Sequence, residues 1–137
     1  MFDLAYNGQA GPVQVRVIGE RQRIPGRYLE QIFQRLRRAS LVRGKRGPGG
    51  GYVLSRTPEE ISLCDIIEAV EGGIAERFAG GPPPRERPPQ ERPNFLWPQL
   101  SARLSQTLSE MSLADLCRQA AARAVRRADA ESRMYHI

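Results

Sequence analysis

The residues with the clearest chemical potential lie on one side of a helix predicted over residues 25–38. Arg27, Glu30 and Gln31 project from the side opposite its apolar residues. Arginine and glutamine can form paired hydrogen bonds with the major-groove edges of guanine and adenine, and glutamate can accept one from cytosine. The N-terminal turn of such a helix usually supplies the base contacts. We therefore expect Arg27, Tyr28, Glu30 and Gln31 to contact bases or nearby phosphates.

Basic residues farther along the chain suit the phosphate backbone. Arg35 and Arg38 lie later on the same helix, where phosphate contacts would position the protein without selecting a sequence. Arg46 precedes a glycine-rich turn, and an arginine there suits the strongly negative minor groove. We expect Arg43 and Lys45 to flank it on the phosphates. For the helix considered alone, an ordinary charged surface remains the alternative.

The basic charge is concentrated toward the N-terminus. Residues 1–56 carry ten arginines and Lys45 against three acidic residues, whereas residues 57–137 carry ten arginines and twelve acidic residues. A polyanion such as nucleic acid is the natural partner of so basic a region. The alternative is a solvated surface that reflects an arginine-rich composition, since only one of the 21 basic residues is lysine.

The sequence does not supply a recognisable catalytic centre. Its one histidine is His136, at the C-terminal end, so histidine-based acid–base or nucleophilic catalysis has no plausible centre. Glu59 and Glu60 precede a capped helix, where interaction with the helix dipole is the simpler interpretation. The glycines at 47–51 do not match a phosphate-binding loop, because Lys45 precedes them and no serine or threonine follows that lysine. We expect a protein that is not an enzyme.

The elements that must position the basic residues follow from apolar spacing and turn signals. Four apolar residues recur at helical intervals after Pro25: Leu29, Ile32, Phe33 and Leu36. A shorter helix over 13–22 precedes them across a break of about four residues, which is a helix-turn-helix pattern. Two strand-like runs then flank Gly47–Gly51 and predict a β-hairpin, or wing. We expect the wing arginine Arg46 and the helix arginine Arg27 to lie side by side on one exposed face.

The second half of the chain predicts helices on either side of a proline-rich segment. Ser62–Asp65 has capping-box form and opens a helix that ends at Gly72-Gly73, and Ser112–Asp115 repeats the device. Between them, a helix beginning near Phe95–Trp97 carries an apolar seam suited to packing against another helix. The residues of that seam, which we expect to mediate dimerisation, are Trp97, Leu100, Leu104, Leu108 and Met111.

We therefore expect a mainly α protein with a small β-hairpin, divided into a winged helix-turn-helix DNA-binding domain (1–72), a proline-rich loop (73–94), a dimerisation helix with a C-terminal helix (95–127) and a tail (128–137). No apolar run approaches the roughly 20 residues that a membrane helix needs, and the N-terminus lacks the features of a secretion signal. The expected location is the cytoplasm.

Three segments closely resemble bacterial regulators of the IscR, NsrR and CymR type, also called the Rrf-two family. They are Arg27–Phe33, Arg46–Leu54 (with the run RGPGGGY) and Asp65–Gly72 (DIIEAVEG). The resemblance runs from about Phe2 to Leu116. It implies a homodimer joined through the long helix, binding pseudo-palindromic operators and usually repressing genes of iron, sulfur, redox or nitric-oxide responses. It also implies DNA contacts for Tyr28, Glu30 and Arg46.

Two departures from the family pattern matter. Cluster-binding relatives place three cysteines, often followed by a histidine, in the interval that corresponds to residues 73–96, which holds no cysteine here. Glu91 stands at the last cysteine position and Asn94 at the histidine position, while Cys64 and Cys117 lie outside the loop. We expect no iron–sulfur cluster of the family type and no metal ligands, a cluster on other ligands being the alternative. Relatives also begin about a dozen residues earlier, so that either the true start lies upstream of Met1 or the first helix is truncated and makes weaker phosphate contacts.

These expectations converge on a sequence-specific DNA-binding transcriptional regulator that acts as a homodimer on double-stranded DNA. The competing hypothesis from another functional class is a winged-helix dimer that serves as a protein-interaction scaffold and does not recognise DNA.

Overall fold

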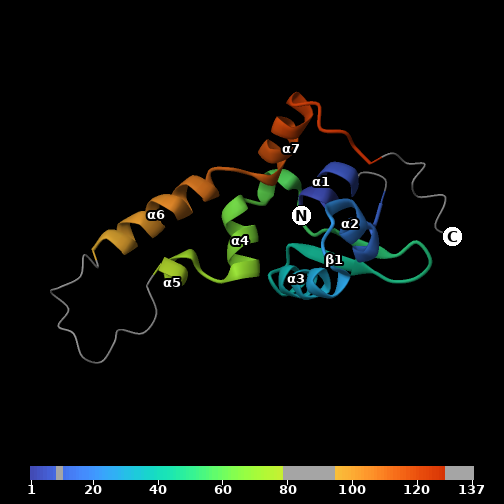
Figure 1. Ribbon diagram of the computed structural model, residues 1–137, viewed down its shortest axis with the longest axis horizontal. Helices are drawn as coiled ribbons and strands as arrows, with labels where there is room; N and C mark the ends of the chain where they lie inside the picture. The colour runs from blue at the N-terminus through green and yellow to red at the C-terminus, as the bar shows by residue number, and fades with distance from the viewer. Residues whose placement is uncertain (9–10, 79–94, 129–137) are drawn as a thin grey trace.

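The computed structural model describes residues 1–8, 11–78 and 95–128 (Figure 1). The elements, in chain order, are helices α1 (Phe2–Asn7), α2 (Val15–Gln22) and α3 (Gly26–Arg38), strands β1 (Val42–Lys45) and β2 (Gly51–Leu54), the 3-10 turn η2 (Pro58–Glu60), and helices α4 (Leu63–Glu71), α5 (Ile74–Phe78), α6 (Leu96–Ser109) and α7 (Leu113–Ala122). The fold is mainly helical with an antiparallel two-stranded hairpin, which confirms the expected winged helix-turn-helix class.

One hydrophobic core joins the helix-turn-helix, the hairpin, α4 and α7. Its buried side chains include Leu4, Ile18, Leu29, Phe33, Leu36, Val42, Ile61 and Leu113, and α4 packs against them through partly buried residues such as Ile66 and Val70. The ring of Phe33 on α3 packs against Tyr52 on β2 with centroids 4.7 Å apart. Burial of one such side chain contributes about 1.5–3 kcal/mol. The core therefore fixes α3 against the hairpin, which are the two elements expected to contact DNA.

Strand β2 is bound to the segment before α2 near the turn end of the hairpin. Val13 and Tyr52 form an isolated antiparallel bridge: the Val13 N–H donates to the Tyr52 carbonyl at 3.0 Å, and the Tyr52 N–H donates back at 2.8 Å. At Gly51, φ is +152° and a Cβ atom would lie 2.5 Å from the Val13 carbonyl oxygen. Only glycine fits so close a backbone approach. Val13, predicted to open the helix, belongs instead to this bridge.

Two capping boxes lie side by side and open α4 and α7. Ser62 and Asp65 exchange hydrogen bonds at the start of α4, and Ser112 and Asp115 do the same at the start of α7, as the sequence predicts. The N–H and hydroxyl of Ser112 donate to the Asp115 carboxylate and lower its pKa below the usual range. Ser62 and Ser112 also pair as an antiparallel bridge, which brings the two helix starts together.

The pairing places α7 in the same unit as the helix-turn-helix and the hairpin. The Leu113 N–H donates to the Ile61 carbonyl at 2.8 Å, and the Leu63 N–H donates to the Met111 carbonyl at 2.8 Å. Both Leu113 and Ile61 are fully buried, and α7 also packs against α1. The sequence-based division into domains grouped α7 with the dimerisation helix. In the structure, α7 instead contacts Ile61 and α1, which lie in the expected 1–72 domain.

The structure differs from the sequence-based expectations at two further places. Residues 74–78 form α5, with Ile74 buried, although the proline-rich loop was expected to begin at residue 73. Helix α6 ends at Ser109, so Met111 lies in the connection to α7 and not on the helical seam. The rest of the proline-rich segment, 79–94, and the tail from 129 lie outside the described residues.

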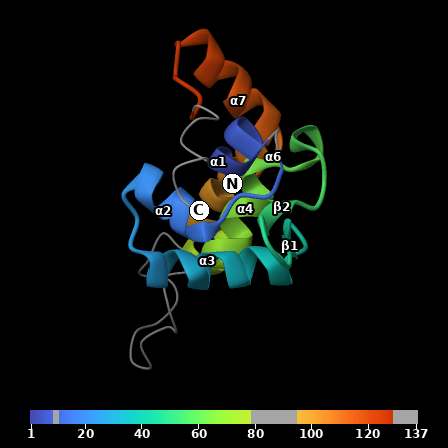
Figure 2. The same ribbon diagram turned by 90° about the vertical axis from the view of Figure 1, so that its right-hand side faces the viewer.

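Helix α6 extends away from the core as an arm (Figure 1). It contacts α4 and α5 on one side, and Ser101, on that helix, is buried. In the view of Figure 2, α3 runs along the bottom of the molecule, with α2 at one end and the hairpin near the other. The arm and α3 are therefore separate surfaces of the chain.

Candidate nucleic-acid interface

The polar side of α3 is exposed along its whole length. The apolar side buries Leu29, Phe33 and Leu36 in the core, as the helical spacing predicts. All the residues expected to contact DNA are exposed: Arg27, Tyr28, Glu30, Gln31, Arg35, Arg38, Arg43, Lys45 and Arg46. Tyr28 is 55% exposed, which is unusual for so large a side chain on a helix that buries its other face. The first turn of α3 is therefore available to a partner.

A groove between α2 and α3 contains the first of these side chains. Arg27 and Glu30 line it from α3, together with Arg16 and Arg23 from α2 and the turn. The Arg16 guanidinium is paired with Glu20 at 2.7 Å. Arg23 ends α2 in the left-handed conformation, at φ 53° and ψ 42°. The tight turn between the helices thus brings Arg27 and Glu30 beside two further arginines that the sequence analysis did not single out.

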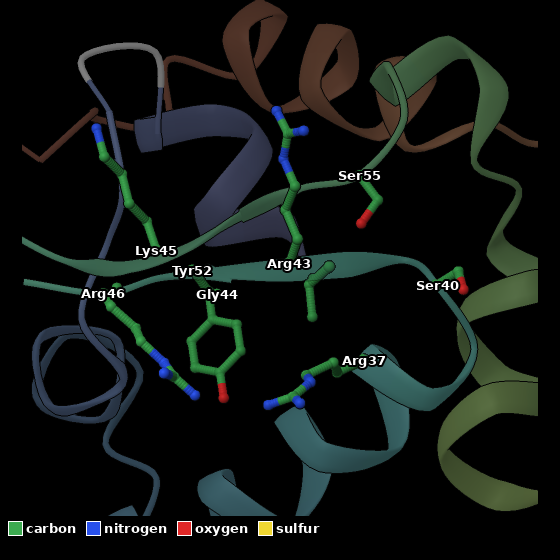
Figure 3. A pocket seen from close by; sticks show the side chains of 10 residues that line it. Arg37, Ser40, Arg43, Gly44, Lys45, Arg46, Tyr52 and Ser55 are labelled. Carbon is green, nitrogen blue, oxygen red and sulfur yellow. The ribbon is translucent and has the colours of Figure 1, made fainter.

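A second groove lies between the other end of α3 and the hairpin (Figure 3). Among the described residues, its lining holds four cationic side chains and no acidic one: Arg37, Arg43, Lys45 and Arg46. In Figure 3, Arg46 and Tyr52 point from the hairpin into the same space as Arg37 from α3. Cations gathered in this way favour an anionic partner. The phosphate backbone of a duplex is such a partner.

Arg43 and Lys45 point toward the opposite side of the hairpin from Arg46 (Figure 3). The reason is the two-residue period of a strand, which sends alternate side chains to opposite faces. The expectation that both residues flank Arg46 on the phosphates therefore needs the duplex to reach both faces of the wing.

Arg37 is the residue that sequence reasoning missed. It follows Gln34 by three positions, so the exposed stripe that begins at Arg27 and Glu30 continues through it. Arg27 and Arg46 are not adjacent, contrary to expectation. Arg27 lines the groove at the first turn of α3, while Arg46 lines the groove beside Arg37 in its last turns, and ten helical residues span about 15 Å.

The two arginines expected to anchor phosphates, Arg35 and Arg38, have different surroundings. The Arg35 guanidinium donates a hydrogen bond of 2.5 Å to the Val70 carbonyl in α4. Arg38 lines a small hollow with Gln34 and Arg37. It makes no hydrogen bond or ion pair with any other described residue, so its guanidinium is available to DNA.

The arm α6 carries an apolar face that no other part of the described chain covers. The exposed side chains and their exposed fractions are Phe95 70%, Leu96 45%, Trp97 42%, Leu100 43% and Leu104 36%. Leu108 is half-buried. Exposed apolar side chains gathered on one helix are typical of an interaction surface. This face includes three of the five residues expected to mediate dimerisation.

The cysteines do not supply the donor set of a thiolate-ligated iron–sulfur cluster, which needs three or four thiolates. The chain has two cysteines. Cys64 is buried in α4, and burial raises the pKa of the half-buried Cys117 thiol in α7. Within the described ranges, no group of three histidine, cysteine or acidic residues is arranged to hold a metal ion.

No helix among residues 1–8, 11–78 and 95–128 is both long and apolar enough to cross a membrane.

Comparison with known proteins gives one consistent result. Residues 1–119 match the model of the family Rrf2, described as an iron-dependent transcriptional regulator. The chain is 40% identical over 116 residues to the HTH-type transcriptional regulator IscR of Aliivibrio salmonicida, a match that covers 85% of this chain and 69% of that protein. It is 39% identical to IscR of Sodalis glossinidius over the same share of this chain and 70% of the relative.

Solved structures agree with the sequence relatives. The fold matches the T. potens IscR structure with a TM-score of 0.71 and 31% identity, over 96% of this chain and 85% of that one. It matches CymR, the global cysteine regulator of B. subtilis, with a TM-score of 0.69 and 32% identity, over 86% and 87% of the two chains.

Proposed function

The chain belongs to the Rrf2 family of bacterial winged-helix transcriptional regulators, and from that premise we propose that it is a homodimeric repressor that binds a pseudo-palindromic operator. In each subunit, α3 enters the major groove and the hairpin lies along the adjacent minor groove. The observation that carries the proposal is the groove between these two elements, where Arg37 from α3 and Arg46 from the hairpin point into one space. Family membership supports regulation over catalysis.

The proposal assigns base contacts and phosphate contacts to different residues. Arg27, Tyr28, Glu30 and Gln31 in the first turns of α3 contact bases, because the N-terminal part of a recognition helix is the part that reaches base edges. Arg37, Arg38, Arg43, Lys45 and Arg46 bind phosphates or the minor groove. The target genes belong to iron, sulfur or redox responses, which the names of the family and of the cysteine regulator support.

We place the dimer interface on the apolar face of α6. Two subunits joined through this arm would cover the exposed Trp97 and Leu100 side chains. They would also present two copies of α3 to half-sites whose centres are about 34 Å, or a multiple of it, apart. The protein works in the cytoplasm, where the DNA is, and it does so without a cysteine-ligated cluster, because its two cysteines lie outside residues 73–96.

The first test of the proposal is the Arg46→Ala variant. We expect it to weaken binding to a duplex selected by this protein from a random-sequence library. The slope of log K against log salt should fall by about 0.9 for each phosphate that the variant no longer neutralises. A salt titration of the dissociation constant measures both effects. The matched control is Arg123→Ala, since Arg123 is exposed at the end of α7, far from α3.

Two outcomes would contradict the assignment. If the parental protein selects no duplex from the library, the scaffold hypothesis is favoured over DNA recognition. If it selects one, but affinity is insensitive to salt and to Arg46→Ala, the DNA-binding surface has been assigned to the wrong residues.

The second test concerns base selection by Glu30. Glu30→Ala should relax the preference at one or two positions of the half-site, because a well-placed base contact contributes about 1–3 kcal/mol of discrimination. Competition between the selected duplex and its single-base-pair variants measures that preference. Glu59→Ala is a control that removes an exposed carboxylate from η2. An unchanged preference profile in Glu30→Ala would remove Glu30 from the base-contacting set.

A further inference from the structure

Within the described ranges, Arg35 is the one basic residue of α3 whose side chain is hydrogen-bonded to another element. Its guanidinium donates to the Val70 carbonyl oxygen at 2.5 Å, and α3 packs against α4 along this contact. Val70 is the penultimate residue of α4, so its carbonyl is among the four that have no partner within the helix. A cationic side chain at this end also interacts favourably with the helix dipole. Arg35 thus caps α4 from α3.

Helix α5 also binds the C-terminal end of α4. Arg77 on α5 donates to the Glu71 carbonyl at 3.4 Å and forms an ion pair with the Glu71 carboxylate. Gly72, at φ 88°, ends the helix immediately afterwards. The C-terminal end of α4 is therefore bound by two other helices. Arg77 of α5 binds the Glu71 carbonyl, and Arg35 of α3 binds the Val70 carbonyl.

We infer that Arg35 is a positioning residue, which sets α3 against α4 so that the first turns of α3 meet the bases, and that it does not bind phosphate itself. The inference rests on the proposed function. To reach a phosphate, the Arg35 guanidinium would have to leave the Val70 carbonyl and expose the end of α4. Arg38, one turn later, has no such bond within the described ranges and can bind phosphate without breaking any hydrogen bond.

The two roles predict different losses of DNA binding. Base contacts need α3 in one orientation, whereas backbone contacts carry no sequence information and tolerate a small rotation of the helix. Loss of a positioning residue therefore lowers affinity for the selected duplex more than for an unrelated one. Loss of a phosphate anchor lowers both alike and reduces the salt slope.

The experiment compares Arg35→Met with Arg38→Met in the full chain. Each variant is titrated with the library-selected duplex and with an unrelated duplex of the same length, over a series of salt concentrations. We expect Arg35→Met to lose about three- to tenfold in affinity for the selected duplex, the usual effect of one hydrogen bond. Its affinity for the unrelated duplex and its salt slope should stay unchanged. Arg38→Met should weaken both duplexes equally and lower the slope by about 0.9 for each phosphate left without its cation.

An equal loss on both duplexes, with a reduced salt slope, in Arg35→Met would overturn the inference. Partial unfolding cannot imitate the expected result, because a smaller active fraction lowers both affinities together. If thermal denaturation shows that Arg35→Met does not fold, Arg35→Gln replaces it in the test. Glutamine keeps an N–H donor for the Val70 carbonyl but removes the charge that a phosphate anchor needs, so an equal loss on both duplexes with a reduced salt slope in that variant would also overturn the inference. A parental protein that selects no duplex contradicts the proposed function and not this inference alone.

Discussion

Leu100→Glu is expected to dissociate the proposed dimer and to abolish operator binding at concentrations where the parental protein is fully bound. Leu100 lies at the centre of the exposed apolar face of α6, between Trp97 and Leu104. A substitution at the centre of an interface costs about 2 kcal/mol or more. A two-fold symmetric dimer carries the change twice. The association constant of the dimer should therefore fall by roughly a thousandfold. Operator affinity should fall with it, because separate monomers would then bind each half-site independently.

Analytical ultracentrifugation of the parental and variant proteins measures this effect, and a titration with the selected duplex measures its consequence. The control is Ala102→Glu, which adds the same charge at an exposed position on the opposite side of α6, because 100° per residue places Ala102 about 160° from both Leu100 and Leu104. A Leu100→Glu protein that stays dimeric at micromolar concentration would show that the subunits, if they associate, use another surface.

Leu113→Ala is expected to lower the free energy of unfolding by about 2–5 kcal/mol, the usual range for a leucine truncated in a core. Leu113 is fully buried, and its N–H closes the bridge to Ile61. Small domains have a total unfolding free energy of only about 5–15 kcal/mol. A single change in α7, outside the expected DNA-binding domain, should therefore destabilise that whole domain.

Urea denaturation followed by circular dichroism measures the change. Leu116→Ala, on the same helix but only half-buried, serves as the control and should cost less. A loss of less than about 1 kcal/mol of unfolding free energy in Leu113→Ala would mean that α7 contributes little to the stability of the core. Residues 1–72 would then form a stable domain without α7, as the sequence predicts.

The features that the sequence predicted well are those specified by near neighbours in the chain. The apolar stripe of α3, the glycine-rich wing and the capping boxes at Ser62 and Ser112 each depend on residues within a few positions of one another. The side of the hairpin on which Arg43 and Arg46 lie was predictable too, since alternation along a strand separates residues three apart. Because Arg46 has the same parity as Val42, which is buried in the core with Phe33 and Leu36 of α3, the rule places Arg46, and not Arg43, on the side of α3.

The features that the sequence did not predict depend on contacts between distant segments. The packing of α7 on α1 and the Arg35–Val70 bond join residues that no local pattern relates. Helix α5 has only five residues and follows Gly72-Gly73, where helix signals are weak. Its position comes from the burial of Ile74 and from the ion pair between Arg77 and Glu71. Tertiary contacts, and not intrinsic propensity, stabilise so short a helix.

The bridge between Ser62 and Ser112 has a consequence for biosynthesis. Ile61 leaves the ribosome about fifty residues before Leu113, the side chain that completes its burial. At roughly 5–20 residues per second, this interval lasts on the order of 3–10 s. During that time the nascent chain has its wing and α3 but not its last core helix. A subunit therefore finishes folding only after its arm has also been synthesised, so each newly made regulator acquires its mature tertiary structure and its means of pairing almost together.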